Sequence, residues 1–452
     1  MAEGCGGRIH SGAPDLEVRR VCTDSRAVQS GDLFIALSGE NFDGHNFLST
    51  AAGRGAAALV FGFSKAAALP SDCAAIEVDD TRAALGRLAA RYRNDFDLPV
   101  VAVGGSNGKT TTKEVLATLL RQKFSTLWSE ASFNNDIGVP LTLLRLDASH
   151  RAAVLEIGTN HPGELAPLIR MIQPRYGIVT SIGREHLEFF GDLAGVAREE
   201  GTLAEMLPAD GKLFINGDTP MVDVLTRRSR ATSVRVGFGA TNHWRVTDVK
   251  LDGRGTAFTV ESPVNGFSGA YRVGLFGRHH VINAVLALAV AVELGVSRSE
   301  AEAGFAACAP AKMRLQLREC AGFQILDDSY NANADSMVAA LETLRDLPCQ
   351  GRRIAVLGDM AELGDQAWSA HMEVGSVVAR CHVSRLFAVG THTPVFSAAA
   401  RAAGLTAVEE FPEADAASKA LKAMVAPGDL ILVKASRSAR LERIVEALQS
   451  RS

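Results

Sequence analysis

Short apolar runs alternate with longer amphipathic stretches along most of the chain. The runs are rich in valine, isoleucine and leucine and lie at residues 100–103, 152–157, 177–181, 212–216, 324–327, 354–358, 386–390 and 430–434. Each has the length of a buried strand, and the alanine- and leucine-rich stretches between most of them predict helices. This alternation predicts an α/β fold with largely parallel, doubly wound sheets.

Residues 243–275 follow a different pattern. Segments 243–249, 255–261 and 270–275 alternate apolar and polar side chains and are separated by glycine-containing turns. Alternation with a period of two, broken by such turns, is typical of antiparallel strands. We therefore expect an antiparallel insert here.

Two places are candidate domain boundaries. Leu98-Pro99 follows a long helical pattern and precedes the 100–103 strand, and near Arg314 the chain passes Pro310 and begins a new series of strands. We expect three domains, at residues 1–98, 99–316 and 317–452, each of ordinary domain size.

Composition narrows the class of protein without giving a function. The chain has 452 residues and a net charge of -4, and its lysines and arginines are spread along it, which favours neither a nucleic-acid partner nor a membrane surface. No apolar run reaches the ~18 residues of a membrane helix, and no signal-peptide pattern opens the chain. Seven dispersed cysteines without a C-x-x-C pair favour reduced thiols. We expect a cytoplasmic protein, and a monomer.

A glycine-rich loop follows the 100–103 strand. Residues 104–111 read Gly-Gly-Ser-Asn-Gly-Lys-Thr-Thr and are followed by a helical pattern. Such loops direct backbone N–H groups and a helix N-terminus at phosphate oxygens, while Lys109 would neutralise the phosphates and the Thr110 hydroxyl would bind Mg²⁺. The spacing is one residue short of the common phosphate-loop pattern, and the alternative is a glycine-rich turn with an accidental Lys-Thr pair.

Two further candidates lie at predicted strand ends. Glu156 ends the 152–157 run, and His186 follows the 177–181 run. Because ligands collect at the carboxyl ends of strands in open α/β sheets, this carboxylate and imidazole could bind a second Mg²⁺. Taken alone, a histidine such as His186 would more often be a loop residue bonded to the backbone.

Several segments together resemble the Mur ligases in order and spacing. They are the 105–110 loop, Asn-Asn-Asp-Ile-Gly-Val-Pro at 134–140, Leu-Glu-Ile-Gly-Thr-Asn-His-Pro-Gly-Glu at 155–164, the His186 segment, Asp-Asp-Ser-Tyr-Asn-Ala-Asn at 327–333, Gly-Asp-Met-Ala-Glu-Leu-Gly at 358–364 and Lys-Ala-Ser-Arg at 434–437. The resemblance implies three domains: a small α/β domain for a UDP-linked substrate, a central phosphate-loop ATPase domain and a C-terminal Rossmann-like domain. The segments at 134–138, 328–333 and 358–364 are similar to those of the member that adds D-alanyl-D-alanine to a UDP-N-acetylmuramoyl tripeptide.

The resemblance also implies roles for individual residues. The nucleotide would contact Gly105, Ser106, Asn107, Gly108, Lys109, Thr110, Thr111, Asn283, Arg314 and Asp328, with Asn283 on adenine, Arg314 on the γ-phosphate and Asp328 on ribose. The catalytic set would be Lys109, Glu156, His186 and Arg314. The UDP substrate would lie on the segments 24–26, 33–37 and 39–45, with Ser25, Arg26, Asp43 and His45, and near Asn134 and Asn135. The dipeptide would face Tyr330, Asn331 and Asn333, and Asn160 and His161 could hold either substrate, although His161 could also be structural.

One position departs from the family. The lysine that is usually carbamylated to hold the second Mg²⁺ is replaced by Glu200. We therefore expect Thr110, Glu156, His186 and Glu200 as metal ligands, with Glu200 supplying the carboxylate directly. The alternative is a solvated acidic face, since residues 198–200 are a run of charges.

Three other functions compete with this interpretation. A Mur ligase that adds the third amino acid should carry an Asp-Asn-Pro-Arg-like segment, and none lies between residues 380 and 440. A phosphate-loop kinase or GTPase is a second class, and a GTPase should carry Asn-Lys-x-Asp, which is also missing from the sequence. An inactive nucleotide-binding module would not need Lys109, Glu156, His186, Arg314 and Asp328 together. The sequence therefore favours a ligase that uses ATP and Mg²⁺ to form an acyl-phosphate, giving ADP and phosphate.

Overall fold

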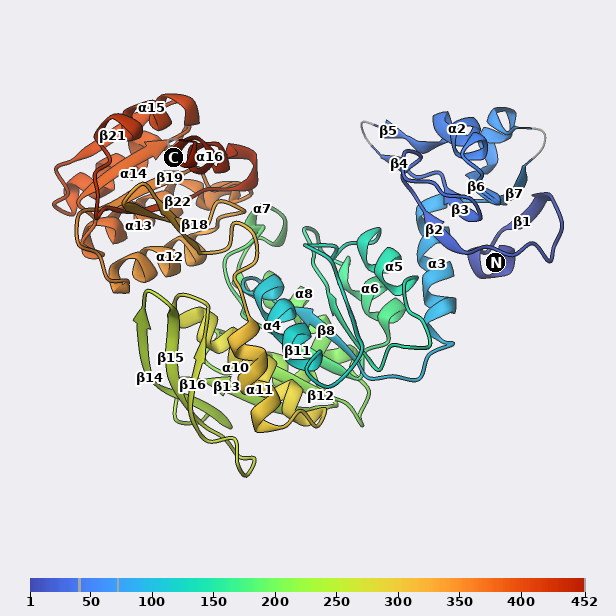
Figure 1. The fold of residues 1–452 in the computed structure, drawn as a ribbon, viewed down its shortest axis with the longest axis horizontal. Coiled ribbons are helices and arrows are strands. Elements are labelled where there is room, and N and C mark those ends of the chain that lie inside the picture. The colour runs from blue at the N-terminus through green and yellow to red at the C-terminus, as the bar shows by residue number, and fades with distance from the viewer. Residues whose placement is uncertain (40–41, 71–72, 451–452) are drawn as a thin grey trace. The chain divides into compact units, whose positions relative to one another are not determined.

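The computed structural model describes residues 1–39, 42–70 and 73–450. The chain forms two compact units. Unit 1 comprises Met1–Ala102, Phe124–Thr159 and Glu164–Arg175, and unit 2 comprises Val103–Lys123, Asn160–Gly163 and Tyr176–Ser452. The chain first crosses between them within β8 (Val100–Gly104), which is labelled in Figure 1.

The N-terminal part of unit 1 is a sheet in the order β1-β7-β6-β3-β2, with β1 antiparallel to its neighbour and the other strands parallel. Its elements are α1 (Ala2–Cys5), β1 (Arg8–Ser11), β2 (Arg20–Cys22), β3 (Asp32–Ile35), β4 (Ser38–Gly39), β5 (Phe42–Asp43), η1 (Gly44–Phe47), α2 (Leu48–Gly53), β6 (Ala58–Gly62), η2 (Phe63–Ala68), β7 (Ala74–Val78) and α3 (Thr81–Arg93). Alternate side chains enter different cores: Leu33 and Ile35 pack on the face of α3, and Phe34 packs on the face of α2.

Unit 1 continues with β9 (Thr126–Trp128), α5 (Gly138–Leu143), β10 (Ala152–Glu156) and α6 (Leu165–Ile172). β10 and β9 are parallel, and the Ala153 N–H donates to the carbonyl oxygen of Pro99 just before β8. α3 packs against both α5 and α6. These contacts place the carboxyl end of β10, with Glu156, inside unit 1.

The first part of unit 2, here called the phosphate-loop lobe, has the strand order β16-β15-β14-β13-β12-β11-β8. Its elements are α4 (Lys109–Leu120), β11 (Tyr176–Val179), α7 (Leu187–Phe190), α8 (Leu193–Met206), β12 (Lys212–Asn216), α9 (Val222–Arg228), β13 (Thr232–Gly237), β14 (Trp244–Asp252), β15 (Gly255–Glu261), β16 (Gly269–Val273), α10 (Arg278–Glu293) and α11 (Arg298–Ala307). β14, β15 and β16 are antiparallel as predicted, but β14 also pairs in parallel with β13, so this insert extends the sheet. α10 lies alongside α4 (Figure 1).

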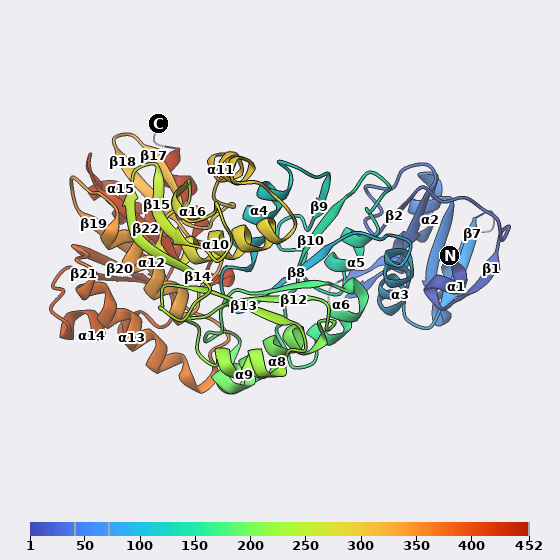
Figure 2. The same ribbon diagram turned by 90° about the horizontal axis from the view of Figure 1, so that it is seen from below.

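The rest of unit 2, here called the C-terminal lobe, has the strand order β17-β18-β22-β19-β20-β21. Its elements are β17 (Gln316–Cys320), β18 (Phe323–Asp327), α12 (Ala334–Asp346), β19 (Arg353–Gly358), η3 (Gly364–Gln366), α13 (Ala367–Arg380), β20 (Arg385–Val389), α14 (Thr393–Ala402), β21 (Val408–Phe411), α15 (Ala414–Met424), β22 (Leu430–Lys434), η4 (Arg437–Ala439) and α16 (Glu442–Gln449). β17 is antiparallel to β18 and the other pairs are parallel. α15 and α16 bury one face of the sheet, and α12 and α13 lie on its other side (Figure 2).

Two further observations concern membrane-spanning helices and the state of the cysteines. In the part of the chain that the structure describes, no helix is long and apolar enough to cross a membrane. Each of the cysteines is a free thiol, and those at 5, 22, 308, 320 and 381 are buried. The fold is the expected α/β fold with mostly parallel sheets.

Candidate active site

The glycine-rich loop joins β8 to α4 in a form that needs glycine at two positions. Gly105 has φ +112°, and a Cβ atom there would lie 2.4 Å from Thr180 Oγ1. Gly108 has φ +92°, and its Cβ would lie 2.5 Å from Asn283 Oδ1 on α10. Both values of φ are in a region that side-chain-bearing residues avoid. The loop therefore presses against β11 and α10 and leads into the N-terminus of α4.

The segment after β11 holds this loop in place. The Ser106 N–H donates to the Ser181 carbonyl oxygen and the Asn107 N–H donates to Ser181 Oγ, both at 2.9 Å. The Gly183 N–H donates to Ser106 Oγ at 2.9 Å. The loop and residues 181–183 therefore form one bonded structure at the carboxyl ends of β8 and β11, the edge at which α/β proteins bind ligands.

Three charged side chains meet beside the loop. Glu200 Oε2, on α8, accepts a hydrogen bond from the Gly105 N–H at 2.6 Å, and Glu185 Oε2 lies 3.4 Å from Lys109 Nζ. Lys109 Nζ also donates to the carbonyl oxygens of Gly105 and Ser106. Only 1% of Glu200 and 6% of Glu185 is exposed. Two buried carboxyl groups therefore lie beside one ammonium group.

These carboxyl groups fit a divalent cation. Glu185 Oε1 and Glu200 Oε1 are both buried and have no hydrogen-bond partner among the described residues. Burial raises the pKa of Glu200 well above its usual range; Lys109 opposes this shift and Glu185 adds to it. Oxygen ligands of this kind, together with the buried Thr110 hydroxyl in the first turn of α4, suit Mg²⁺.

Glu156 is held within unit 1. It ends β10, is 1% exposed, and its Oε1 accepts a hydrogen bond from Asn134 Nδ2 at 2.9 Å. The Glu156 N–H donates to Ser129 Oγ at 3.1 Å. Asn135 has a local bond, because its Oδ1 accepts from the Ile137 and Gly138 N–H groups at the start of α5. Asn134 therefore orients the carboxylate, whereas the Asn135 side chain stabilises a helix end.

His186 reaches the C-terminal lobe. It precedes α7 with φ 47°, a left-handed conformation uncommon for a residue with a side chain, and its Nδ1 contacts Glu362 Oε2. The exposed His161 packs its ring 4.2 Å from that of Phe189, and Asn160 beside it is exposed. The structure thus brings Glu185, and not the adjacent His186, to Lys109.

Two histidines begin α10 beside Asn283. Burial lowers the pKa of His279 to about 4, with Lys434 adding to the shift and Asp328 opposing it. Burial also holds the pKa of His280 well below its usual range, and its Nδ1 has no hydrogen-bond partner among the described residues. Both rings are therefore neutral near pH 7. α10 also contacts α12 of the C-terminal lobe.

The predicted residues of the C-terminal lobe form a second cluster. The buried Lys434 Nζ lies 2.6 Å from Asp328 Oδ2 and 2.9 Å from the Asn331 carbonyl oxygen. Asp328 Oδ1 accepts from the Leu315 N–H at 3.1 Å, and the guanidinium carbon of Arg314 lies 4.1 Å from the centre of the Tyr330 ring. The carboxylate of Asp328 thus has a partner at each oxygen.

Asn333 links this cluster to the phosphate loop. It caps α12 through Oδ1, which accepts from the Ser336 N–H at 2.8 Å, and its Nδ2 donates to Asn107 Oδ1 at 3.0 Å. Asn333 therefore fixes a helix start and touches the loop at the same time. Thr111, also predicted in the loop set, is buried in α4.

The N-terminal candidates lie in unit 1. Asp43 Oδ1 faces His45 Nδ1 at 2.6 Å, and Asp43 Oδ2 lies 2.9 Å from Lys65 Nζ, which is the main cause of the lowered pKa of Asp43. His45 Nε2 accepts from the Gly62 N–H, so the ring proton is on Nδ1. Ser25 is buried and Arg26 is exposed. Glu40 and Asn41, from the predicted cradle, lie outside the described residues.

Another group of possible metal ligands lies in the C-terminal lobe. Ligand atoms of Asp359, His371 and His392 lie within 4.8 Å of one another. However, His371 Nε2 accepts from the Met360 N–H at 3.1 Å, and its Nδ1 contacts the Ala367 carbonyl oxygen at 2.6 Å. Because both ring nitrogens are already bonded to the backbone, this cluster is explained by packing.

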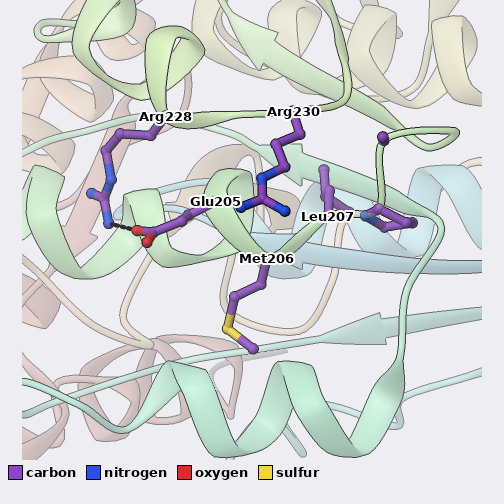
Figure 3. A pocket seen from close by; sticks show the side chains of 7 residues that line it. Glu205, Met206, Leu207, Arg228 and Arg230 are labelled. Carbon is purple, nitrogen blue, oxygen red and sulfur yellow. Dashed lines mark hydrogen bonds and ion pairs between the residues drawn. The ribbon is translucent and has the colours of Figure 1, made fainter.

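A hollow of about 780 Å³ lies at the end of α8, where Glu205 pairs with Arg228 and Arg230 faces Met206 and Leu207 (Figure 3). β11 and β12 are parallel, so α8 carries the chain from the carboxyl edge of the sheet back to the amino edge. The hollow is therefore at the edge away from the phosphate loop, and it does not belong to the site.

Sequence reasoning missed several residues of this site. Glu185 beside Lys109, and Arg184, Glu362 and Glu373 between the lobes, were not singled out. The signal available was weak: residues 184–186 read Arg-Glu-His, but a loop sequence does not tell which side each residue faces.

Comparisons with known proteins place this geometry in a family. The family descriptions that match are "Mur ligase family, catalytic domain" at residues 17–93, "Mur ligase middle domain" at 103–291 and "Mur ligase, glutamate ligase domain" at 313–437. The Escherichia coli UDP-N-acetylmuramoyl-tripeptide--D-alanyl-D-alanine ligase is 38% identical over 96% of this chain and 94% of its own length. A MurF crystal structure from Acinetobacter baumannii aligns with a TM-score of 0.88 at 32% identity, covering 99% of this chain and 97% of that one. MurF from Thermotoga maritima in complex with ADP aligns with a TM-score of 0.83 at 27% identity, covering 97% and 99%.

Proposed function

The chain belongs to the Mur ligase family, and we propose that it joins D-alanyl-D-alanine to a UDP-N-acetylmuramoyl tripeptide, converting ATP to ADP and phosphate. The observation that carries this proposal is the match to the Escherichia coli ligase of that name over nearly its whole length. The phosphate loop supports the use of ATP, and the similarity to an ADP-bound MurF agrees with it.

The first step activates the carboxylate of the tripeptide. A carboxylate oxygen of the tripeptide attacks the γ-phosphorus of ATP, and the bond between that phosphorus and the β-phosphate oxygen breaks. The products are ADP and an acyl-phosphate of the tripeptide. Charge on the transferred phosphoryl group must be stabilised by fixed positive groups. We assign this role to Lys109, which already lies over the loop, and to Arg314. The loop residues 105–108, Thr110 and Thr111 would hold the phosphates, with Asn283 at adenine and Asp328 at ribose.

Mg²⁺ would supply further positive charge at the phosphates. The residues proposed to hold it are Thr110, Glu156, His186 and Glu200. The structure supports adding Glu185, because its Oε2 lies beside Lys109 while its Oε1, like Oε1 of Glu200, has no hydrogen-bond partner among the described residues. In this arrangement Glu200 replaces a carbamylated lysine. Glu200 would supply directly the carboxylate that a carbamate otherwise supplies, and Glu185 would add a second one.

The second step forms the amide. The neutral amine of D-alanyl-D-alanine attacks the acyl carbon, its proton passes to a base or to water, and phosphate leaves. Tyr330, Asn331 and Asn333 would face the dipeptide, since Asn333 touches the phosphate loop through Asn107. Asn160 and His161 remain candidates for holding either substrate.

The remaining assignments concern unit 1 and the whole chain. Ser25, Arg26, Asp43 and His45, with Asn134 and Asn135, would bind the UDP-linked substrate. We place domain boundaries after residues 98 and 316, which limited proteolysis would test. The free thiols and a nucleotide-linked substrate favour action in the cytoplasm, and we expect a monomer by sedimentation.

ADP release tests the reaction. We expect release only when ATP, Mg²⁺, UDP-N-acetylmuramoyl tripeptide and D-alanyl-D-alanine are all present, with one ADP and one phosphate per amide formed. Lys109→Met should lower kcat by about 100- to 1000-fold, the usual effect of losing one charge-stabilising donor. Lys419→Met, an exposed lysine on α15, should have no effect. Turnover with the UDP-muramoyl dipeptide and a single free amino acid would overturn the proposal in favour of the enzyme that adds the third residue.

A further inference from the structure

Arg184 stands between the two lobes of unit 2. It belongs to the loop between β11 and α7 of the phosphate-loop lobe, and its guanidinium faces two carboxylates of the C-terminal lobe. Its Nε and Nη2 contact Asp335 Oδ1 at 2.9 and 2.6 Å, and its Nη1 and Nη2 contact Glu373 Oε2 and Oε1 at 2.5 and 3.1 Å. The Arg184 N–H also donates to Asp335 Oδ2 at 2.7 Å. One side chain thus bridges α12 and α13 to this loop.

The backbone is shaped for this contact. A Cβ atom at Gly183 would lie 2.7 Å from Asp335 Oδ2, so a larger residue there would displace that carboxylate from the loop. The Gly183 N–H donates to Ser106 Oγ, and two residues beyond Arg184 the His186 ring meets Glu362. The residues that hold the phosphate loop therefore also hold the C-terminal lobe.

The ion pairs of Arg184 with Asp335 and Glu373 are chemically suited to hold the two lobes of unit 2 together. A guanidinium has five N–H donors in a rigid fork and remains charged at any physiological pH, so it can serve two carboxylates together. Isolated exposed ion pairs contribute little, but a bidentate network with fixed geometry contributes more. The Arg184, Asp335 and Glu373 side chains are 31%, 37% and 41% exposed, so added salt can weaken the bridge.

We propose that Arg184 is a positioning residue that fastens the C-terminal lobe to the phosphate loop and so sets where the 330–333 segment stands during amide formation. Asp335 is two residues from Asn333, which contacts Asn107 of the loop, so the bridge and the proposed dipeptide contacts share the start of α12. The kinetic consequence rests on the proposed function, whereas the fastening itself does not.

X-ray scattering of the full chain tests the fastening without substrates. We expect Arg184→Gln to increase the radius of gyration and Arg184→Lys, which keeps the charge but loses the fork, to increase it less. High salt should increase it for the unaltered protein and leave Arg184→Gln unchanged. The matched control is Arg272→Gln, which removes a bidentate pair with Asp252 within the β14–β16 insert. An unchanged radius for Arg184→Gln, or an equal change for the control, would overturn the proposal.

Kinetics and calorimetry test the consequence for the site. Arg184→Gln should raise KM for the dipeptide by about tenfold, as expected for a loss of some 1.4 kcal/mol, while ADP affinity by titration calorimetry stays within twofold. Glu373→Gln, which removes one of the two ion pairs, should raise KM by less. The double variant should be little worse than Arg184→Gln alone, since Arg184→Gln already removes the pair with Glu373. Additive effects, or an equal loss of ADP affinity, would reject the positioning role. If the unaltered protein shows no ligase activity but Arg184→Gln still increases the radius of gyration, the proposed function is wrong and the fastening by Arg184 stands.

Discussion

Two clusters of buried charge in unit 2 differ in their balance. Beside the phosphate loop, Glu185 and Glu200 face the single ammonium of Lys109, and one oxygen of each carboxyl group has no hydrogen bond among the described residues. In the C-terminal lobe, Asp328 faces Lys434, and both Asp328 oxygens are bonded. The first cluster carries an excess of acid, and the second is neutral and satisfied.

This difference in charge balance distinguishes a binding site from a structural ion pair. Burying an ion is costly unless partners replace its water, and a satisfied pair such as Asp328 with Lys434 meets that condition internally. The Glu185 and Glu200 cluster does not, so it must take up a proton or a cation. The same burial therefore stabilises the fold in one place and prepares a binding site in the other.

Breaking the balanced pair should have the largest effect. Lys434→Met leaves the Asp328 carboxylate buried beside an apolar side chain, and such a loss costs about 3–5 kcal/mol of folding free energy. Urea denaturation measures it. The double variant Lys434→Met with Asp328→Asn should recover part of the loss, because no buried charge remains.

Lys65→Met is the matched control for this prediction. Lys65 also pairs with an aspartate, Asp43, at 2.9 Å, but its side chain is 43% exposed. Water can replace the lost partner there, so we expect little change in stability. An equal loss in Lys65→Met and Lys434→Met would mean that burial does not distinguish the two pairs.

Removing one acid from the unbalanced cluster should leave the fold stable and weaken metal binding. Glu200→Gln relieves repulsion between the two carboxyl groups, so the metal-free protein should not lose stability, while Mn²⁺ affinity by calorimetry should fall by at least about tenfold. Glu185→Gln should act in the same direction. Bicarbonate should not raise activity, because no carbamate is needed.

Glu205→Gln controls for a change of charge on the same helix. Glu205 is an exposed acid near the end of α8 that pairs with Arg228, so its loss should leave Mn²⁺ affinity unchanged. Activity that rises with added bicarbonate, or full activity in Glu200→Ala, would refute the role of Glu200 as a direct ligand.

Histidines beside the balanced pair should make stability depend on pH. His279 has a folded pKa of about 4, lowered mainly by burial, against about 6.5 in an unfolded chain. Below pH 6.5 the unfolded chain therefore binds a proton that the folded chain does not. Stability is complete above pH 6.5 and is lost as the pH falls toward 4, by about 1–2 kcal/mol between pH 7 and 5.

The pH effect is measured as a difference between variants. Urea denaturation at pH 7 and 5 should show a smaller loss for His279→Gln than for the unaltered protein. His10→Gln, which changes an exposed histidine on β1, should keep the full loss. Equal pH dependence in His279→Gln and the unaltered protein would show that His279 is protonated freely in the folded state.

The sequence predicted what depends on local pattern. β12, β15 and β22 begin and end at the predicted residues, since compact apolar or alternating runs bounded by turns define strands directly. The glycine loop was found because Gly105 and Gly108 are required by backbone geometry. The mostly parallel sheets followed from strand–helix alternation.

The sequence could not predict which side a loop residue faces. Arg184, Glu185 and His186 are consecutive, yet they meet Asp335, Lys109 and Glu362. These directions depend on the left-handed backbone at His186 and on the approach of α12, which is a tertiary contact over 150 residues away. For the same reason, the parallel pairing of β14 with β13 was not foreseen from the alternation within the insert.

The exposed ion pair between Arg26 and Asp24 is the third case, and breaking it should have the smallest effect on stability. Arg26 pairs with Asp24 at 2.8 Å on the surface of unit 1, where both groups remain hydrated. The hydrogen bond from Arg26 is the main reason why the pKa of Asp24 is lowered to about 2. Arg26→Ala should therefore return the Asp24 pKa toward about 3.9 in an NMR titration, while the melting temperature stays unchanged because water solvates the free carboxylate. Binding of the UDP-linked substrate should weaken if Arg26 belongs to its cradle. A large fall in melting temperature would mean that the pair is structural, and it would then belong with Asp328 and Lys434.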